Sequence, residues 1–122
     1  MSTVELDGSN FEETISGNDI VVVDFWAPWC GPCKSFGPIY EKVSEEIENV
    51  VFAKVNTEAE QELASHFQIR SIPTLMIFRE QIVIFSQPGM VPADGLKDLI
   101  AKTQELDMSD VRKQIQEQES KA

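Results

Sequence analysis

Both cysteines of the chain lie in one five-residue segment, and this segment stands where a strand pattern gives way to a helix pattern. The segment reads Trp29-Cys30-Gly31-Pro32-Cys33. The preceding residues, 20–26, are apolar apart from Asp24, which predicts a buried strand. Downstream, apolar residues recur at helical spacing, namely Phe36, Ile39, Tyr40, Val43 and Ile47. The chain must therefore fold so that a strand leads into a helix whose first turn carries two thiols.

The two thiols differ by position. Cys30 falls at or just before the predicted helix start, where free backbone N–H groups and the helix macrodipole stabilise a thiolate. Cys33 lies one turn further on and on the same side of that turn, within reach for a disulfide. We therefore expect Cys30 to attack a substrate disulfide and Cys33 to resolve the intermediate.

Two other interpretations of the thiol pair are a pair of inert buried thiols and half of a zinc site. Zinc normally needs four ligands, and the only other soft ligand, His66, falls on a separate predicted helix. His66 itself is expected to be a surface or partly buried helix residue. We expect redox chemistry at the cysteines rather than a metal site.

Size and charge limit the classes of partner. The 122 residues fit one compact domain, and 42% hydrophobic content is ample for one core. A formal net charge of −11 opposes binding to nucleic acid or to anionic membranes, so neutral or basic proteins are the expected partners. Residues 1–8 lack the features of a secretory signal, and no apolar run is long enough to cross a bilayer. We expect a cytoplasmic location, although a mature form without its signal would look the same.

The remaining pattern predicts an α/β domain. Strands are expected at residues 3–6, 20–26, 50–56, 74–78 and 82–86. Helices are expected from a cap at Ser9 or Asn10 to about Gly17, from Cys30 to about Asn49 with a kink at Pro38, and over residues 58–67 and 94–105. Strands that alternate with helices and then form a hairpin indicate a central mixed sheet flanked by helices on both faces.

The composition changes near the end of the chain, so we divide it into a domain at residues 1–105 and a helical extension or tail at 106–122. Glu and Gln dominate the tail, and Met108, Val111 and Ile115 share one helix face. A helix starting near Asp107 or Ser109 can dock on the domain, pair with another copy or remain solvated. A stripe of three apolar residues buries little, which favours a solvated or weakly docked helix.

The segment from Trp26 to Lys34, which reads Trp-Ala-Pro-Trp-Cys-Gly-Pro-Cys-Lys after a buried strand, resembles the active-site signature of the thioredoxin family. The resemblance extends over about residues 4–104 and implies the thioredoxin fold. Other residues in the order and spacing of that family are Asp24, Pro38, Lys54, Ile72-Pro73-Thr74 and Gly89.

The chain departs from the family pattern at two loops. The hairpin turn reads Arg79-Glu80-Gln81 where the family usually has Gly, so either the turn is longer or one residue is strained. Pro88 and Met90 flank Gly89 where the family has aliphatic and small residues, which affects how far partner preferences carry over.

Asp24 interrupts an apolar strand, so we expect its carboxyl to be buried and its pKa raised. A carboxyl tuned toward neutral pH near Cys33 can take the proton of that thiol and later return it. The residues alone leave a structural acid, hydrogen-bonded to the backbone, equally open; the resemblance favours the catalytic role.

Lys54 lies on the next expected strand and seeks a carboxylate, for which Asp24 is the expected partner. The pair would then titrate as a unit with the thiols. The alternative is a lysine that extends to solvent from a strand end.

Pro73 opens a strand, and the sequence by itself predicts a trans Ile72–Pro73 bond. The resemblance reverses this expectation and implies a cis proline facing the cysteines, which would free the Ile72 backbone to pair with an extended substrate. A nearly uncharged docking patch for proteins is expected from Trp29, Gly31, Pro32, Ile72, Pro73, Gly89 and Met90. Trp26 is expected to pack beneath the site, and Lys34 to favour the thiolate.

Together these expectations describe a monomeric thiol–disulfide oxidoreductase that keeps cytosolic protein thiols reduced through a redox-active Cys30–Cys33 disulfide, with no cofactor bound to the chain, as the resemblance implies. The resemblance implies that electrons come from NADPH through a flavoprotein thioredoxin reductase, and that disulfide-containing client proteins are the substrates. An oxidase or isomerase on the same fold, and a non-catalytic interaction module, remain as alternatives.

Overall fold

The computed structural model describes residues 3–121, so residues 1–2 and 122 of the expected domain and tail lie outside it. Its strands are β1 (Thr3–Glu5), β2 (Ile20–Trp26), β3 (Val51–Asn56), β4 (Thr74–Arg79) and β5 (Ile82–Pro88). Its helices are α1 (Phe11–Ser16), α2 (Gly31–Glu46), α3 (Gln61–His66), α4 (Ala93–Glu105) and α5 (Met108–Lys121).

The strands form one five-stranded mixed sheet in the order β1-β3-β2-β4-β5. β3 runs parallel to β1 and β2, whereas β4 is antiparallel to both β2 and β5. β2 therefore occupies the centre, where both of its faces are covered and its near-continuous apolar sequence is buried. The predicted α/β fold class with a central mixed sheet is confirmed.

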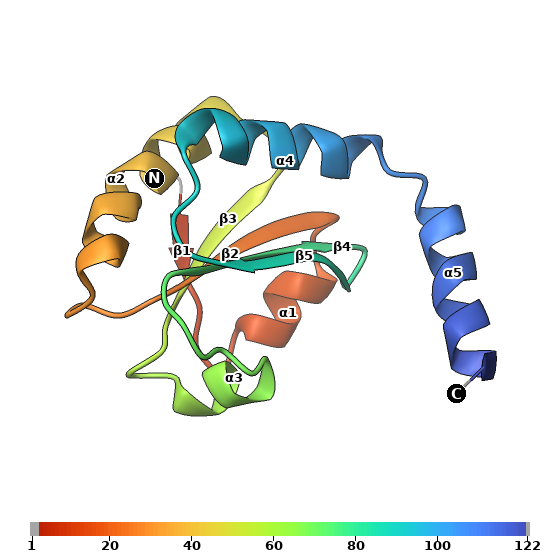
Figure 1. Ribbon diagram of the computed structural model, residues 1–122, viewed down its shortest axis with the longest axis horizontal. Helices are drawn as coiled ribbons and strands as arrows, with labels where there is room; N and C mark the ends of the chain where they lie inside the picture. The colour runs from red at the N-terminus through yellow and green to blue at the C-terminus, as the bar shows by residue number, and fades with distance from the viewer. Residues whose placement is uncertain (1–2, 122) are drawn as a thin grey trace.

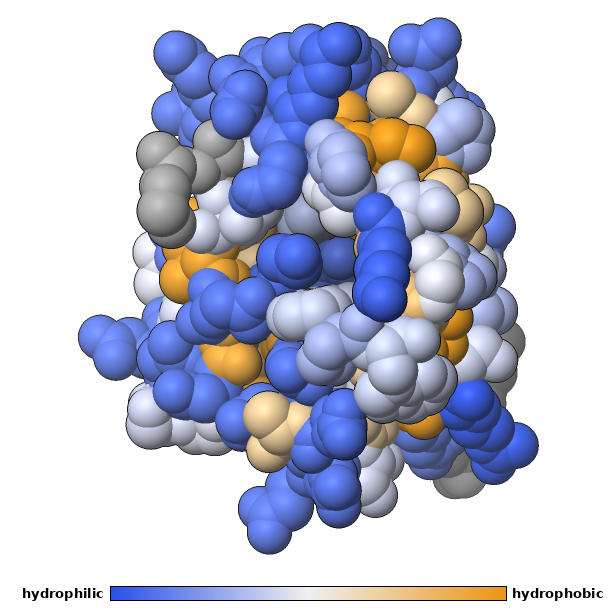
Figure 2. Space-filling model, turned by 90° about the vertical axis from the view of Figure 1, so that its left-hand side faces the viewer, coloured by the Kyte–Doolittle hydropathy of each residue, from blue (hydrophilic) through white to orange (hydrophobic). Residues whose placement is uncertain are grey.

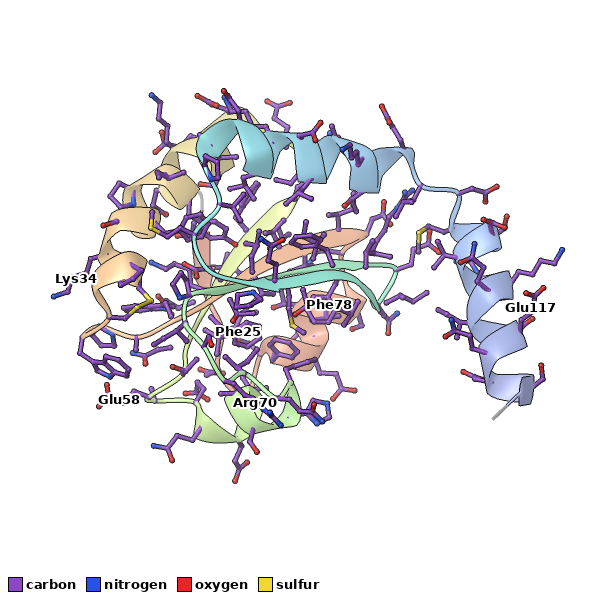
Figure 3. The ribbon with its side chains drawn as sticks, viewed as in Figure 1. Phe25, Lys34, Glu58, Arg70, Phe78 and Glu117 are labelled. Carbon is purple, nitrogen blue, oxygen red and sulfur yellow. A yellow bond between two sulfur atoms is a disulfide. The ribbon has the colours of Figure 1, made fainter. Side chains whose placement is uncertain are left out.

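Helices cover both faces of the sheet (Figure 1). On one face α2 and α4 pack over alternate strand residues such as Val22, Phe52 and Ile77. On the other face α1 and α3 pack over the intervening residues, which include Phe25 and Phe78 (Figure 3). Because successive side chains of a strand point to opposite faces of the sheet, each strand contributes side chains to two apolar cores.

Tyr40 fixes α2 to the sheet. Its buried hydroxyl lies 2.9 Å from the carbonyl oxygen of Val22 and 2.8 Å from that of Ala53, and it can donate its one proton to either. These carbonyls belong to β2 and β3, so the bond sets the height of α2 above the strand pair that carries Asp24 and Lys54.

Several expected boundaries were wrong. α2 ends at Glu46, three residues before the predicted Asn49, because Ile47 is extended and Asn49 adopts a φ of 66°. α3 begins at Gln61 rather than near residue 58, since residues 57–59 form a turn. Asn10 is the residue before α1, but its side chain accepts the N–H of Asp7 and does not cap the helix. Pro38 lies inside α2, and the expected kink stays a prediction.

The β4–β5 hairpin turns tightly through Glu80 and Gln81, whose φ angles are 50° and 70°. The turn is therefore not longer than usual, and two residues rather than one occupy the left-handed region that usually takes Gly or Asn. A bulge between Ile77 and Phe78 shifts the strand register just before this turn.

α5 stands at the end of the molecule opposite α2 (Figure 1). Met108 is buried, and Val111 and Ile115 are half-buried beside a groove of about 250 Å³ that they share with Ile82 and Ile84 of β5. Asp107 caps the helix by accepting the N–H groups of Ser109 and Asp110. The expected second helix is thus present, and only one residue of its stripe is fully buried. No helix within residues 3–121 combines the length and apolar character that a membrane span needs.

Candidate active site

The two cysteines form a disulfide at the start of α2. Their Cα atoms are 5.2 Å apart, and each cysteine is 5% exposed. Ala27 completes this small buried cluster, and Trp26 and Ile72 pack against it. The structure thus brings together the motif and the loop before β4, which are more than 40 residues apart in sequence.

The inequivalence predicted for the two sulfurs appears in their hydrogen bonds. Cys30 occupies the N-cap of α2, with Gly31 and Pro32 following in the first turn. The backbone N–H of Cys33 donates to Sγ of Cys30 at 3.2 Å. A donor aimed at Sγ of Cys30 favours the thiolate of that residue over its thiol.

The Ile72–Pro73 peptide bond is cis, as the family resemblance implied and the sequence alone did not. The carbonyl oxygen of Ile72 lies 3.7 Å from Sγ of Cys30, and this is a contact rather than a hydrogen bond because a disulfide sulfur has no proton to donate. The carbonyl of Pro73 accepts the N–H of Gly89 at 2.7 Å. Gly89 has a φ of 96°, which requires glycine, so this loop can close onto Pro73.

The surface around the cysteines exposes large side chains. Trp29 is 68% exposed and Met90 is 41% exposed. Figure 2 shows this face with pale and orange surface between blue charged groups, not as one continuous apolar area. Lys34 is exposed and its side chain points away from the fold (Figure 3), so the structure places its charge in solvent.

Asp24 is 1% exposed in the middle of β2, and neither of its carboxylate oxygens has a hydrogen-bond partner among the described residues. Burial raises the pKa of Asp24 to about 7; nearby Lys54 acts to lower this pKa, and Glu5 acts to raise it. The backbone hydrogen bond assumed for a purely structural acid is therefore not present among the described residues, and the catalytic role of Asp24 stays a prediction. A carboxyl that titrates near neutral pH can exchange protons with a thiol.

Lys54 lies directly across from Asp24 on β3, as predicted, but the expected close pair does not form. Among residues 3–121, Lys54 makes no ion pair with any carboxylate. Its Nζ instead lies 4.6 Å from the centre of the Trp26 ring, a cation–π contact. Lys54 therefore acts on Asp24 through the field of its charge and not through a hydrogen bond.

Glu5 was not predicted to belong to this site. It lies directly across from Lys54 on β1, and the pairing of β1 with β3 brings it there. The sequence carries no local signal of this neighbourhood, because strand order is a tertiary property.

No group of side chains within residues 3–121 has the composition and geometry of a metal site. His66 is exposed on α3, on the face of the sheet opposite Asp24, as expected for a surface helix residue. Its ring packs against Phe67.

Known proteins agree with this geometry. The sequence pattern of the family described as Thioredoxin matches residues 2–102. A Streptomyces coelicolor protein named "Putative thioredoxin 2" is 54% identical over 121 residues, which is 99% of this chain and 90% of that protein. Thioredoxin of Mycoplasmoides gallisepticum is 39% identical over 92 residues, or 75% of this chain and 92% of that one. A solved mutant thioredoxin of Halobacterium salinarum superposes with a TM-score of 0.81 at 34% identity, covering 87% of this chain and 94% of the other.

Proposed function

From the premise that the chain belongs to the thioredoxin family and exchanges dithiol for disulfide through Cys30 and Cys33, we propose that it reduces disulfide bonds in other proteins. Membership makes it a thiol–disulfide oxidoreductase whose redox group is the Cys30–Cys33 disulfide.

Cys30 is the attacking thiol in this proposal. Its thiolate attacks one sulfur of the client disulfide, a bond forms between the two sulfurs, and the other client sulfur leaves as a thiolate that takes a proton from water. The observation that carries this assignment is the Cys33 N–H directed at Sγ of Cys30 from the first turn of α2. Such a donor stabilises the Cys30 thiolate before it attacks the client disulfide.

Cys33 completes the exchange. Its thiol gives its proton to the Asp24 carboxylate, the resulting thiolate attacks Sγ of Cys30, and the Cys30–Cys33 bond forms as the second client thiolate leaves. Two electrons pass from the protein dithiol to the client disulfide. The raised pKa of Asp24, about 7, suits an acid that must both accept and return a proton near neutral pH. Lys54 assists by tuning that carboxyl from the neighbouring strand.

The client docks over the exposed side of the disulfide. The cis Pro73 loop leaves the Ile72 backbone beside Sγ of Cys30, where an extended segment can pair with it. We assign the docking surface to the residues of the motif and the two loops, namely Trp29, Gly31, Pro32, Ile72, Pro73, Gly89 and Met90. Exposure of Trp29 and Met90 supports transient contact with many clients.

The partners are disulfide-containing proteins and a flavoprotein thioredoxin reductase that returns electrons from NADPH. We assign the catalytic domain to residues 1–105 and the extension to 106–122, and propose that the protein acts as a monomer in the cytoplasm. The break between α4 and α5 after Glu105 supports this boundary.

The reduction potential of the Cys30–Cys33 couple tests the direction of electron flow. We expect a potential well below that of the glutathione pool when the protein is equilibrated in thiol buffers, since each 30 mV is about 1.4 kcal/mol for a two-electron couple. A potential at or above that pool would indicate an oxidase or isomerase. Cys30→Ser should abolish reduction of a protein disulfide, and retained reduction by this variant would overturn the mechanism.

A further inference from the structure

One lysine lies between two carboxylates in a single row across three neighbouring strands. Glu5 of β1 is opposite Lys54 of β3, and Lys54 is opposite Asp24 of β2. Residues paired across adjacent strands project to the same face, and these strands are about 4.8 Å apart. The three side chains therefore share the face that α2 covers, with the cation in the middle.

The two acids differ in access to water. Asp24 is buried at the sheet centre, whereas Glu5 is exposed on the edge strand. Partial desolvation nonetheless raises the pKa of Glu5, and the charge of Lys54 acts to lower it. Lys54 thus stabilises the ionised form of both acids while forming an ion pair with neither within the described part of the chain.

We propose that Glu5 is a positioning residue for the proton transfer at Asp24: it competes for the ammonium of Lys54 and keeps that cation from pairing with the Asp24 carboxylate. The inference rests on the proposed role of Asp24 as the group that takes the proton of Cys33. Its positioning role is exerted through Lys54, in addition to a direct repulsion of the ionised Asp24 carboxyl.

The charged groups that act on Asp24 are few. Lys54 lowers its pKa and Glu5 raises it. From β4 the residue opposite Asp24 is Leu75, which is apolar. From α2, Tyr40 is neutral with a pKa raised by burial, and Glu41 contacts Thr3 of β1.

The negative charge of Glu5 affects Asp24 in two ways that have the same sign. It repels the ionised form of Asp24 directly, and it attracts Lys54 toward β1. Removing this charge relaxes both effects, so Asp24 should ionise at lower pH and become a weaker base for Cys33.

Glu5→Gln tests the proposal, with the full chain in its oxidised and reduced forms. Titration of the Asp24 carboxyl by carbon-13 NMR in the oxidised protein should give a midpoint lower by about 0.3–0.6 pH units at low salt. In the reduced protein, a chromogenic aromatic disulfide releases its second thiol when Cys33 resolves the mixed disulfide. The pH dependence of that second phase should move in the same direction, and high salt should shrink both shifts because Glu5 is exposed.

Glu45→Gln is the matched control, because Glu45 is an exposed acid on α2 and its loss changes net charge by the same amount. Both midpoints should stay where they are in this variant. Equal behaviour of the two variants would overturn the proposal.

A background that lacks Lys54 separates the action of Glu5 through Lys54 from its direct repulsion of Asp24. In Lys54→Met, the shift caused by Glu5→Gln should fall to less than half, and an undiminished shift would contradict the positioning role. Failure of this inference is distinguishable from failure of the proposed function. If Glu5→Gln moves nothing while the wild type reduces disulfides and Cys30→Ser does not, only the role of Glu5 falls.

Discussion

Two groups of charged residues, one across β1, β3 and β2 and the other at the β4–β5 hairpin, both combine acidic and basic side chains but differ in burial and pairing. The row of Glu5, Lys54 and Asp24 brings three ionisable groups side by side without an ion pair between them. Asp24, at the end of this row, is buried beneath α2. At the β4–β5 hairpin, Arg79 and Glu80 instead pair closely with the C-terminal helices.

In the hairpin group, the guanidinium of Arg79 donates to the carbonyl oxygens of Thr103 at 2.6 Å and Leu106 at 2.9 Å. Glu80 forms an ion pair with Arg112 of α5 at the surface. Burial of Asp24 without an ion pair raises the pKa of its carboxyl, and the ionised form therefore opposes folding. Pairing at the surface instead contributes modest stability.

The largest effect is expected from Asp24→Asn. Folded Asp24 holds its proton up to a pKa of about 7, whereas an ordinary Asp releases it near 3.8, so stability falls as pH rises through this window. At pH 8 the variant should gain about 2–4 kcal/mol of unfolding free energy, at about 1.4 kcal/mol for each pH unit. Denaturant unfolding of the oxidised proteins at pH 4 and pH 8 measures this gain.

At pH 4 the two proteins should differ little, because Asp24 is protonated in the folded wild type. Resolution of a mixed disulfide by Cys33 should at the same time become slower and lose its titration near neutral pH. Equal stabilisation at both pH values would show that the Asp24 carboxyl does not titrate as described. Burial without pairing would then not explain how the row differs from the hairpin group.

An intermediate effect is expected from Arg79→Ala. The side chain of Arg79 is 16% exposed, and its removal takes the guanidinium donor away from the carbonyl oxygens of Thr103 and Leu106 at the end of α4. We expect a loss of about 1.5–3 kcal/mol in unfolding free energy. Hydrogen exchange of the last turn of α4 should rise with it, and the reduction potential should not move, since this turn is remote from the cysteines. A loss below about 0.5 kcal/mol would mean that solvent replaces Arg79 freely.

The smallest effect is expected from Arg112→Gln, which removes the surface pair with Glu80 and keeps a long polar side chain. Half of the Arg112 side chain is exposed, at 51%. The loss should be below about 1 kcal/mol and should shrink in high salt. Thermal unfolding at low and high ionic strength checks this, with Lys113→Gln, an exposed neighbour on α5, as the charge-matched control. A loss equal to that of Arg79→Ala would place α5 among the firmly docked elements.

Local patterns were a good guide wherever a single element carried the information. The strand at 20–26, the helix start at Cys30 and the inequivalence of the two thiols follow from hydropathy and helix-terminus chemistry, and the structure has all three. The ends of helices and strands were harder to predict from local sequence. The early end of α2 and the left-handed Glu80 and Gln81 depend on how the chain must turn to enter the next strand.

The sequence by itself determined which residues could do redox chemistry, because thiolate stabilisation needs only a cysteine at a helix start. It also determined that Asp24 would be buried, since an acid within an apolar strand has no other place. Only the tertiary structure decided what surrounds that acid. The order β1-β3-β2 places Lys54 and Glu5 in its row, and the ring of Trp26, not a carboxylate, receives the ammonium. Coulomb interactions depend on distances between strands, and no stretch of contiguous sequence encodes those distances.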